Sequence, residues 1–231
     1  MGVLVLLVLV IMLGPAAAHA CVETFDSGNA GWTTYSINST GYVTGTGSSF
    51  SSTGGNPGGY IFGNVGNSSD NRLYSFEVSG TATGSLTGET LMVDYRSTGT
   101  ITGPAGANVR FYIADAGGTN YFFSSAWDAN TGGIWTSHTA LVDAASFTPW
   151  TNNDGKTTFA QVAANPGWVG VIFTNGDFSS TNNLGFTSTN GATISIDNFG
   201  TPDPAPMPPA FVLFGPCIAA LAVIRRKWKH H

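Results

Sequence analysis

The sequence predicts an all-β protein with an antiparallel sandwich fold, and three observations support that class. Short apolar runs alternate with polar residues, which is the period of a half-buried strand. Clusters of Gly, Asn and Ser separate these runs and are typical of turns. The composition is 42% hydrophobic and 12% aromatic but only 9% charged, against about 25% in ordinary soluble domains. Such a composition is typical of an extracellular β-protein, and residues 21–200 are enough for one such domain.

The strands follow from the alternation, segment by segment. The predicted strands are Arg72–Gly80, Thr90–Thr98, Asn108–Asp115, Trp168–Gly176 and Ala192–Phe199. Their predicted core-facing residues are Tyr74, Phe76, Val78, Leu91, Val93, Tyr95, Val109, Phe111, Ile113, Val169, Val171, Phe173, Ile194 and Ile196. Asp94 and Arg96 fall on the opposite face of their strand. Only Phe159–Asn165 is predicted to be a short helix.

The N-terminus has the pattern of a secretory signal peptide over residues 1–20. An apolar run from Val3 to Leu13 is followed by the small residues of Ala18-His19-Ala20. Cleavage there makes Cys21 the first residue, where lipidation is an alternative fate. The other interpretation of residues 1–20 is a retained anchor helix, although the run is short for a membrane span.

The C-terminus has three parts. A proline-rich stretch at 201–209 predicts an extended spacer, because proline fits neither helix interiors nor central strands. An apolar segment begins at Ala210, and Arg225, Arg226, Lys227 and Lys229 follow it. In an exported chain this basic end stays cytoplasmic, so residues 210–231 predict a single transmembrane helix with a basic tail.

This tail resembles the PEP-CTERM sorting signal of Gram-negative bacteria, although Pro202-Asp203-Pro204 stands where that signal has Pro-Glu-Pro. The resemblance implies a transient inner-membrane anchor, recognition by an exosortase and release to the cell surface or the extracellular space. The basic residues carried over are Arg225, Arg226 and Lys227. An ordinary tail anchor is the alternative.

The order of landmarks along the body resembles bacterial relatives of the laminin domain IV (laminin B) module. The resemblance rests on "GGNPGGYIFGNV", on the block from Trp150 to Phe173 and on "ISIDNF" near the end. It implies a jelly-roll β-sandwich for residues 21–200, akin to galactose-binding and carbohydrate-binding modules, and no fixed ligand. The epidermal-growth-factor-like repeats that accompany the module in laminins do not occur in this chain.

Catalytic and nucleic-acid-binding functions are not favoured by the sequence. The body carries one histidine, His138, so a Ser-His-Asp triad cannot be completed, and His138 is predicted to be structural or at the surface. Its four cations, Arg72, Arg96, Arg110 and Lys156, form no basic stripe, so we expect no nucleic-acid partner. A glycan-active hydrolase with a carboxylate pair stays a lesser alternative.

Two binding hypotheses remain: a carbohydrate- or matrix-binding module, and a structural or adhesive matrix component without a discrete ligand site. Sugars stack on aromatic rings and bond to amides and carboxylates. The candidate ligand-binding residues are therefore Trp127, Asp128, Asn130, Tyr121 and Trp135. The alternative for each aromatic residue is a place in the core.

A structural calcium ion is the predicted cofactor. The first and last strands of a jelly roll commonly lie close together, which would bring Glu23 and Asp26 near Asp197. Calcium takes carboxylate and carbonyl oxygens, and the resemblance to carbohydrate-binding jelly rolls favours such an ion. Glu23 and Asp197 are the preferred ligands and Asp26 the third. The alternative is that these acids cap strand ends or face solvent.

Overall fold

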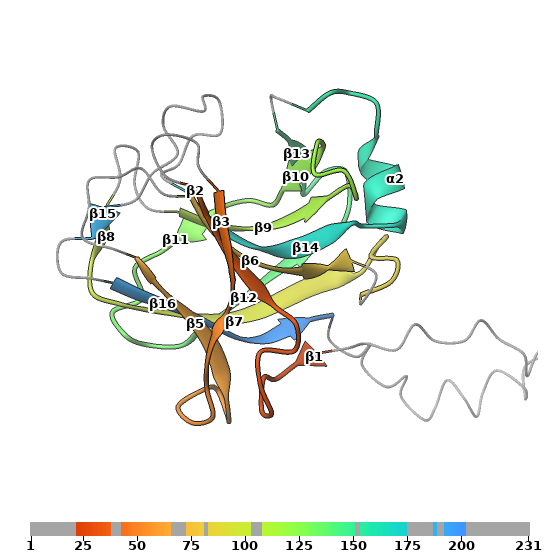
Figure 1. Cartoon of the computed structure of the whole chain (residues 1–231). Helices are drawn as coiled ribbons and strands as arrows, with labels where there is room; N and C mark the ends of the chain where they lie inside the picture. Colours follow the sequence, from red (N-terminus) through yellow and green to blue (C-terminus); the bar gives the residue numbers. More distant parts are fainter. Residues whose placement is uncertain are drawn as a thin grey trace, which may run out of the picture. The chain divides into compact units, whose positions relative to one another are not determined.

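The computed structural model has two large antiparallel sheets packed face to face (Figure 1). It describes residues 22–37, 43–65, 73–80, 83–102, 108–150, 153–174, 187–188 and 192–201, all of which belong to one unit, Cys21–Pro202. The predicted signal peptide at 1–20, Cys21 and the sorting segment from Pro202 to His231 lie outside the described residues. Within the described ranges, no helix has the length and hydropathy that a membrane span requires.

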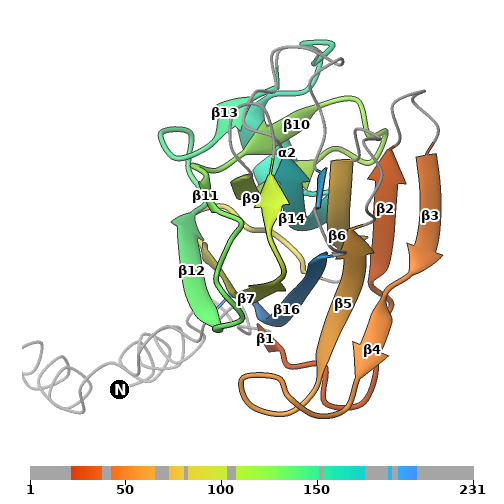
Figure 2. The same cartoon turned by 90° about the vertical axis from the view of Figure 1, so that its left-hand side faces the viewer.

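Sheet A contains the first and last strands of the domain. Its order is β12 (Thr136–Leu141), β7 (Thr90–Thr98), β16 (Ala192–Gly200), β5 (Tyr60–Val65) and β4 (Ser49–Ser51), and β1 (Val22–Glu23) pairs with the end of β16. Figure 2 shows β12 on one side of this sheet and β5 and β4 on the other, with β7 and β16 between them. Because β16 pairs with β1, β5 and β7, the last strand holds the sheet together.

Sheet B forms the second layer. Its order is β13 (Thr148–Pro149), β10 (Tyr121–Phe123), β9 (Asn108–Ala114), β14 (Trp168–Thr174), β6 (Leu73–Ser79), β2 (Thr33–Ile37) and β3 (Val43–Gly47), and β11 (Trp127–Asp128) pairs with β9. A separate two-stranded sheet joins β8 (Ile101–Thr102) and β15 (Thr187–Ser188).

The chain passes from one sheet to the other at Ser48, between β3 and β4. Ser48 is buried, its N–H donates to the carbonyl oxygen of Trp32 at 3.1 Å, and its hydroxyl lies 2.9 Å from that of Thr34. These bonds satisfy the polar groups that the break in pairing would leave buried. One edge of the sandwich is thereby closed by continuous chain.

The core fills the space between the inward faces of the sheets. Tyr95 and Phe173 lie 5.5 Å apart between ring centroids, and Phe111 lies 6.1 Å from Phe199. The predicted inward residues of β7, β9, β14 and β16 are all 0% exposed. The sequence-based inward assignment of these strands is therefore confirmed, as is the all-β class.

The short helix α2 spans Phe159–Ala164, within the predicted segment. Thr158 caps it: the Thr158 side chain accepts the N–H of Gln161, and the Gln161 side chain accepts the N–H of Thr158 at 2.8 Å. This capping box satisfies two backbone donors that the helix itself cannot. Val162 and Ala163 are the residues that α2 buries against the sandwich.

Replacing Phe111 by alanine should lower the free energy of unfolding by about 3–5 kcal/mol, because the ring is fully buried and leaves a cavity. Urea unfolding followed by tryptophan fluorescence measures the change. The matched control is Phe50→Ala, since Phe50 is 37% exposed and should cost far less. Equal losses for the two variants would contradict the inward assignment of β9.

Candidate functional site

An aromatic cluster covers the outer face of sheet B, outside the inter-sheet core. We call it the aromatic face and define it as Tyr112, Tyr121, Phe123, Trp150 and Trp168. Tyr121 stacks on Phe123 at 6.2 Å and 7°, and meets Trp150 edge-on at 5.7 Å. Tyr112 lies 6.1 Å from Tyr121. Tyr121, Trp150 and Trp168 keep part of their surface exposed, whereas Tyr112 and Phe123 are buried beneath them.

Strand alternation accounts for this face. On β9, Val109, Phe111 and Ile113 point into the core, so Arg110 and Tyr112 point outward. The pairing register then sets Phe123 beside Tyr112 on β10.

Glycine in the middle of β14 connects the aromatic face to an acid. Gly170 is paired with Tyr112 on one side and with Glu77 on the other, and the Tyr112 hydroxyl donates to Glu77 across it. A Cβ at position 170 would overlap the carbonyl oxygen of Phe76. Glycine at this position therefore lets the backbones of β14 and β6 approach each other closely.

The charged groups of this face are already engaged. Burial raises the pKa of Glu77, and the hydrogen bonds from Tyr112 and Ser75 offset this only in part. Burial also raises the pKa of Tyr112 well above its ordinary value, so it stays a neutral hydroxyl donor. Arg110 donates to the carbonyl oxygen of Ser124 at 3.0 Å. Because Glu77 and Arg110 are bonded to other groups of the domain, they do not need a charged ligand as a partner. The exposed rings beside them suit a ligand that carries no net charge.

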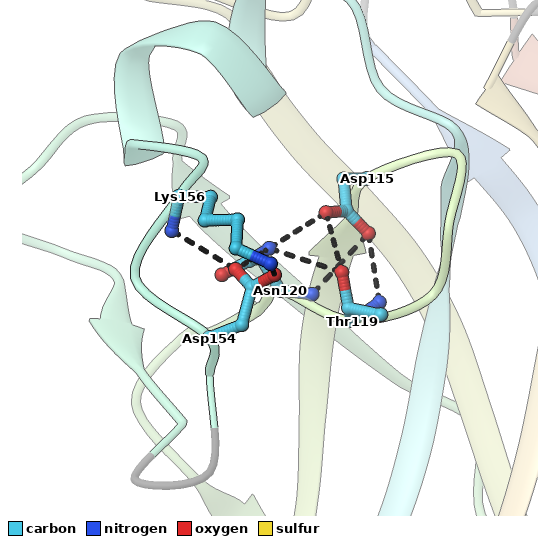
Figure 3. A network of polar contacts seen from close by, with 5 residues as sticks. All are labelled: Asp115, Thr119, Asn120, Asp154 and Lys156. Atoms are coloured by element: carbon cyan, nitrogen blue, oxygen red, sulfur yellow. Dashed lines mark hydrogen bonds and ion pairs between the residues drawn. The ribbon is translucent and has the colours of Figure 1, made fainter.

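A polar network joins the loop that follows β9 to the loop that follows β13 (Figure 3). The Asn120 amide donates to Asp115 at 2.7 Å and to Asp154 at 2.8 Å. Asp115 also accepts the N–H and hydroxyl of Thr119, and Lys156 lies 3.4 Å from Asp154. Burial acts to raise the pKa of Asp115, but the hydrogen bonds from Asn120 and Thr119 outweigh it and the pKa falls to about 2.

The same two loops hold the aromatic pair. The Tyr121 N–H donates to the Asn153 side chain at 2.8 Å, and the Asn153 amide donates back to the Tyr121 carbonyl at 2.9 Å. The Trp150 N–H donates to that carbonyl as well, at 2.9 Å. Tyr121 and Trp150 are thus held by backbone bonds before any ligand arrives.

The structure separates the candidate ligand-binding residues into four places. Trp127 stacks on His138 at 4.4 Å and 9° and contacts Phe111. Burial lowers the pKa of His138, which is opposed by Asp94, and its ring bonds to Thr136.

The other four candidates lie apart from that stack. The Asn130 side chain accepts the N–H of Ile101 at 2.9 Å and donates to the Ile101 carbonyl oxygen at 3.0 Å. The Asp128 side chain accepts the Asn130 N–H at 2.8 Å. Only Tyr121 belongs to the aromatic face, while Trp135 lies on the outer face of sheet A beside Arg96. Alternating polarity on β9 was the sequence signal for Tyr112, but nothing local indicated Glu77 or Trp150.

Two of the predicted metal ligands, Asp26 and Asp197, lie close to a glycine turn at residues 54–59. Asp26 accepts the N–H of Gly59 at 3.3 Å, and Asp197 accepts the N–H of Asn56 at 2.6 Å. Glu23 instead accepts the N–H of Phe25 at 2.9 Å. In the part of the chain that is described, no three Asp, Glu, His or Cys side chains form a group that could hold a metal. The carboxylates on the turn have the oxygen chemistry that calcium requires, and the calcium site stays a prediction.

Two buried acids are cross-strand neighbours in sheet A. Asp197 on β16 is paired with Asp94 on β7. Asp94 accepts bonds from Ser137, Asn56 and Asn198. Burial, followed by the charges of Asp94 and Asp26, raises the pKa of Asp197 to about 6 against the hydrogen bonds of Asn56 and Asn198. Asp197 is 0% exposed, so it has no surface on which to meet a glycosidic bond.

Comparison with known proteins gives similarity in structure and none in sequence. No protein-family model matches the chain, and no curated protein matches it. The family 11 carbohydrate-binding module of cellulase Lic26A-Cel5E from Clostridium thermocellum is 12% identical, with a TM-score of 0.46 over 80% of this chain and 95% of that one.

Two further structures give similar values. The family 11 module from the same organism in complex with a β-1,3-1,4-mixed-linked tetrasaccharide is 14% identical, with a TM-score of 0.47 over 80% of this chain and 96% of that one. A mutant of the family 29 module CBM29-2 complexed with mannohexaose is 12% identical, with a TM-score of 0.40 over 80% of this chain and 92% of that one.

The raised pKa of Asp197 predicts how stability depends on pH. The folded-state pKa of about 6 exceeds the ordinary 3.8, so the fold disfavours the ionised form. This destabilisation is absent below pH 3.8 and complete above pH 6. The free energy of unfolding should therefore fall as the pH rises through that window. Replacing Asp197 by asparagine should remove this part of the decline. Urea unfolding at a series of pH values measures it, and parallel profiles for variant and wild type would contradict it.

Proposed function

We propose that the domain binds a neutral polysaccharide on the outer face of sheet B. The observation that carries the proposal is the aromatic face, where partly exposed rings are fixed in place beside engaged polar groups. A pyranose ring presents C–H groups that pack on Tyr121 and Trp150, and hydroxyls that bond to Glu77 and Arg110. Burial of the ring faces against sugar supplies affinity, and the polar groups supply orientation.

Binding without catalysis is the interpretation that we favour. A hydrolase needs two carboxyls that flank a substrate bond. Beside the aromatic face Glu77 is bonded to Tyr112, and Asp115 and Asp154 are both bonded to Asn120. The paired acids Asp94 and Asp197 are buried under the glycine turn. A role as a structural matrix component without a ligand site is the second candidate. It predicts that no polysaccharide binds to the purified domain.

Replacing Tyr121 or Trp150 by alanine should weaken polysaccharide binding at least tenfold, which corresponds to about 1.4 kcal/mol, because each removes one stacking surface. Affinity electrophoresis through gels that contain neutral β-linked glucans or mannans, followed by titration calorimetry on the retained one, measures this. Phe50→Ala is the matched aromatic control and should bind as the wild type does. Unchanged affinity in both variants would place any binding elsewhere.

We also propose that the chain is exported and sorted. Residues 1–20 would direct export, and the segment from Pro202 to His231 would anchor the chain in the inner membrane until an exosortase-type enzyme removes it. The proposal rests on the sequence: on the apolar run and small residues of 1–20, and on the resemblance of the tail to the PEP-CTERM signal. Intact mass of the extracellular protein tests it: a mature chain should begin near Cys21, and one that retains Arg225–His231 would rule it out.

A structural calcium at the glycine turn is proposed on the oxygens of Asp26 and Asp197, with Glu23 as the third candidate. Bound calcium would compensate the negative charge gathered there. It should raise the melting temperature, since a ligand that binds only the folded state stabilises it. Differential scanning calorimetry with calcium and with chelator measures the shift. An unmoved midpoint, or an equal shift in Asp197→Ala, would exclude the site.

A further inference from the structure

A second aromatic cluster lies on the outer face of sheet A, on the other layer of the sandwich from the aromatic face. We call it the arginine platform and define it as Tyr60, Phe62, Arg96 and Trp135. Phe62 and Arg96 flank Ser195, their common partner on β16. Tyr60 meets Trp135 edge-on at 5.7 Å and lies 5.7 Å from Phe62. All four side chains are partly exposed.

The guanidinium of Arg96 lies over two of these rings. Its central carbon is 4.4 Å from the centroid of Trp135 and 4.9 Å from that of Tyr60. Such a position is attractive, because the ring faces are electron-rich. The rings therefore help to hold the guanidinium in place.

One carbonyl oxygen holds the platform in place. Gly54 accepts a bond from the Trp135 indole N–H at 3.1 Å and from Arg96 Nη1 at 3.2 Å. Gly54 has φ +91°, a conformation that side-chain-bearing residues rarely adopt, so this turn depends on glycine there. Arg96 and Trp135 are thus fixed relative to each other before a ligand binds.

The platform lacks an anion for its cation. Within the described residues, no carboxylate lies within ion-pair distance of Arg96, and its buried Nε has no hydrogen-bond partner. The two acids near it on the sheet are occupied, since Asp94 is bonded by Ser137, Asn56 and Asn198, and Asp197 by the N–H groups of Asn56 and Asn198. The positive charge of Arg96 therefore has no carboxylate partner among the described residues.

We propose that the arginine platform is a second binding site, for a sugar chain that carries carboxylates, that is, a polyuronate. Because Nε is buried and one N–H of Nη1 is bonded to Gly54, the donors left for a carboxylate are the other N–H of Nη1 and those of Nη2. These lie side by side and match the two oxygens of a carboxylate. The same sugar ring can pack its C–H face on Tyr60, and Phe62 extends the apolar surface. The site is independent of the proposed function, because it uses no residue of the aromatic face.

The test is titration calorimetry with a hexameric uronate and with its methyl ester, in which the carboxylates are neutral. The wild type should bind the uronate at least tenfold more tightly than the ester, and raised salt should weaken that binding. Equal affinity for the two sugars would overturn the proposal.

Three variants locate the site. Arg96→Gln should lose uronate binding at least tenfold, and Arg96→Lys should recover only part of it, because lysine keeps the charge and loses the planar fork. Tyr60→Leu, which leaves Arg96 in place, should weaken binding of both sugars and serves if Arg96→Gln does not fold. Uronate affinity that is unchanged in Arg96→Gln, or in a folded Tyr60→Leu, would overturn the proposal.

The aromatic-face variant Tyr121→Ala separates this site from the proposed function. It should bind the uronate as the wild type does while losing the neutral polysaccharide. Loss of uronate binding in Tyr121→Ala, with binding retained in Arg96→Gln, would assign the uronate to the other sheet and overturn the arginine platform. Failure of neutral binding alone would leave the platform standing and remove only the function proposed for sheet B.

Discussion

Side-chain alternation is the constraint on which the rest of this structure depends. A strand that sends every second residue into a shared core must send the others outward. Packing Phe111 against Phe199 therefore also fixes where Tyr112 and Arg110 emerge, and burying Tyr95 fixes Arg96. The packing of the shared core therefore determines which side chains lie on each outer face. Their side chains rest on paired strands, whose positions are set by many bonds at once.

The charged side chains on the two outer faces have different kinds of partner. On sheet B, Glu77 and Arg110 are bonded within the domain, and burial keeps the pKa of Glu77 raised. On sheet A, Arg96 has rings and a carbonyl oxygen as neighbours but no carboxylate among the described residues. The first arrangement suits a neutral surface, whereas the second leaves a positive charge uncompensated. One sandwich thus presents two chemically distinct surfaces.

Strands with an apolar period could be predicted from the sequence, as could the capped helix Phe159–Ala164. The strands β2, β3 and β4 could not, because Thr, Ser and Gly dominate them and give no apolar alternation. The site was harder. Tyr121 and Trp135 were both candidates as aromatic residues, but they lie on the outer faces of different sheets. The bond from Tyr112 to Glu77 passes over Gly170, and it depends on a register between distant strands that local sequence does not encode.

The pairing of β1 with β16 has a mechanical consequence. Val22 is paired with Gly200, so the chain enters and leaves the domain at one spot. A pull applied through the two ends would act first on this two-residue ladder and on the end of β16, where Gly200 also pairs with Met92 of β7. Most of the domain would then lie beside the stretched chain, outside the line of force. Both outer faces would then keep their side-chain arrangement under such a pull.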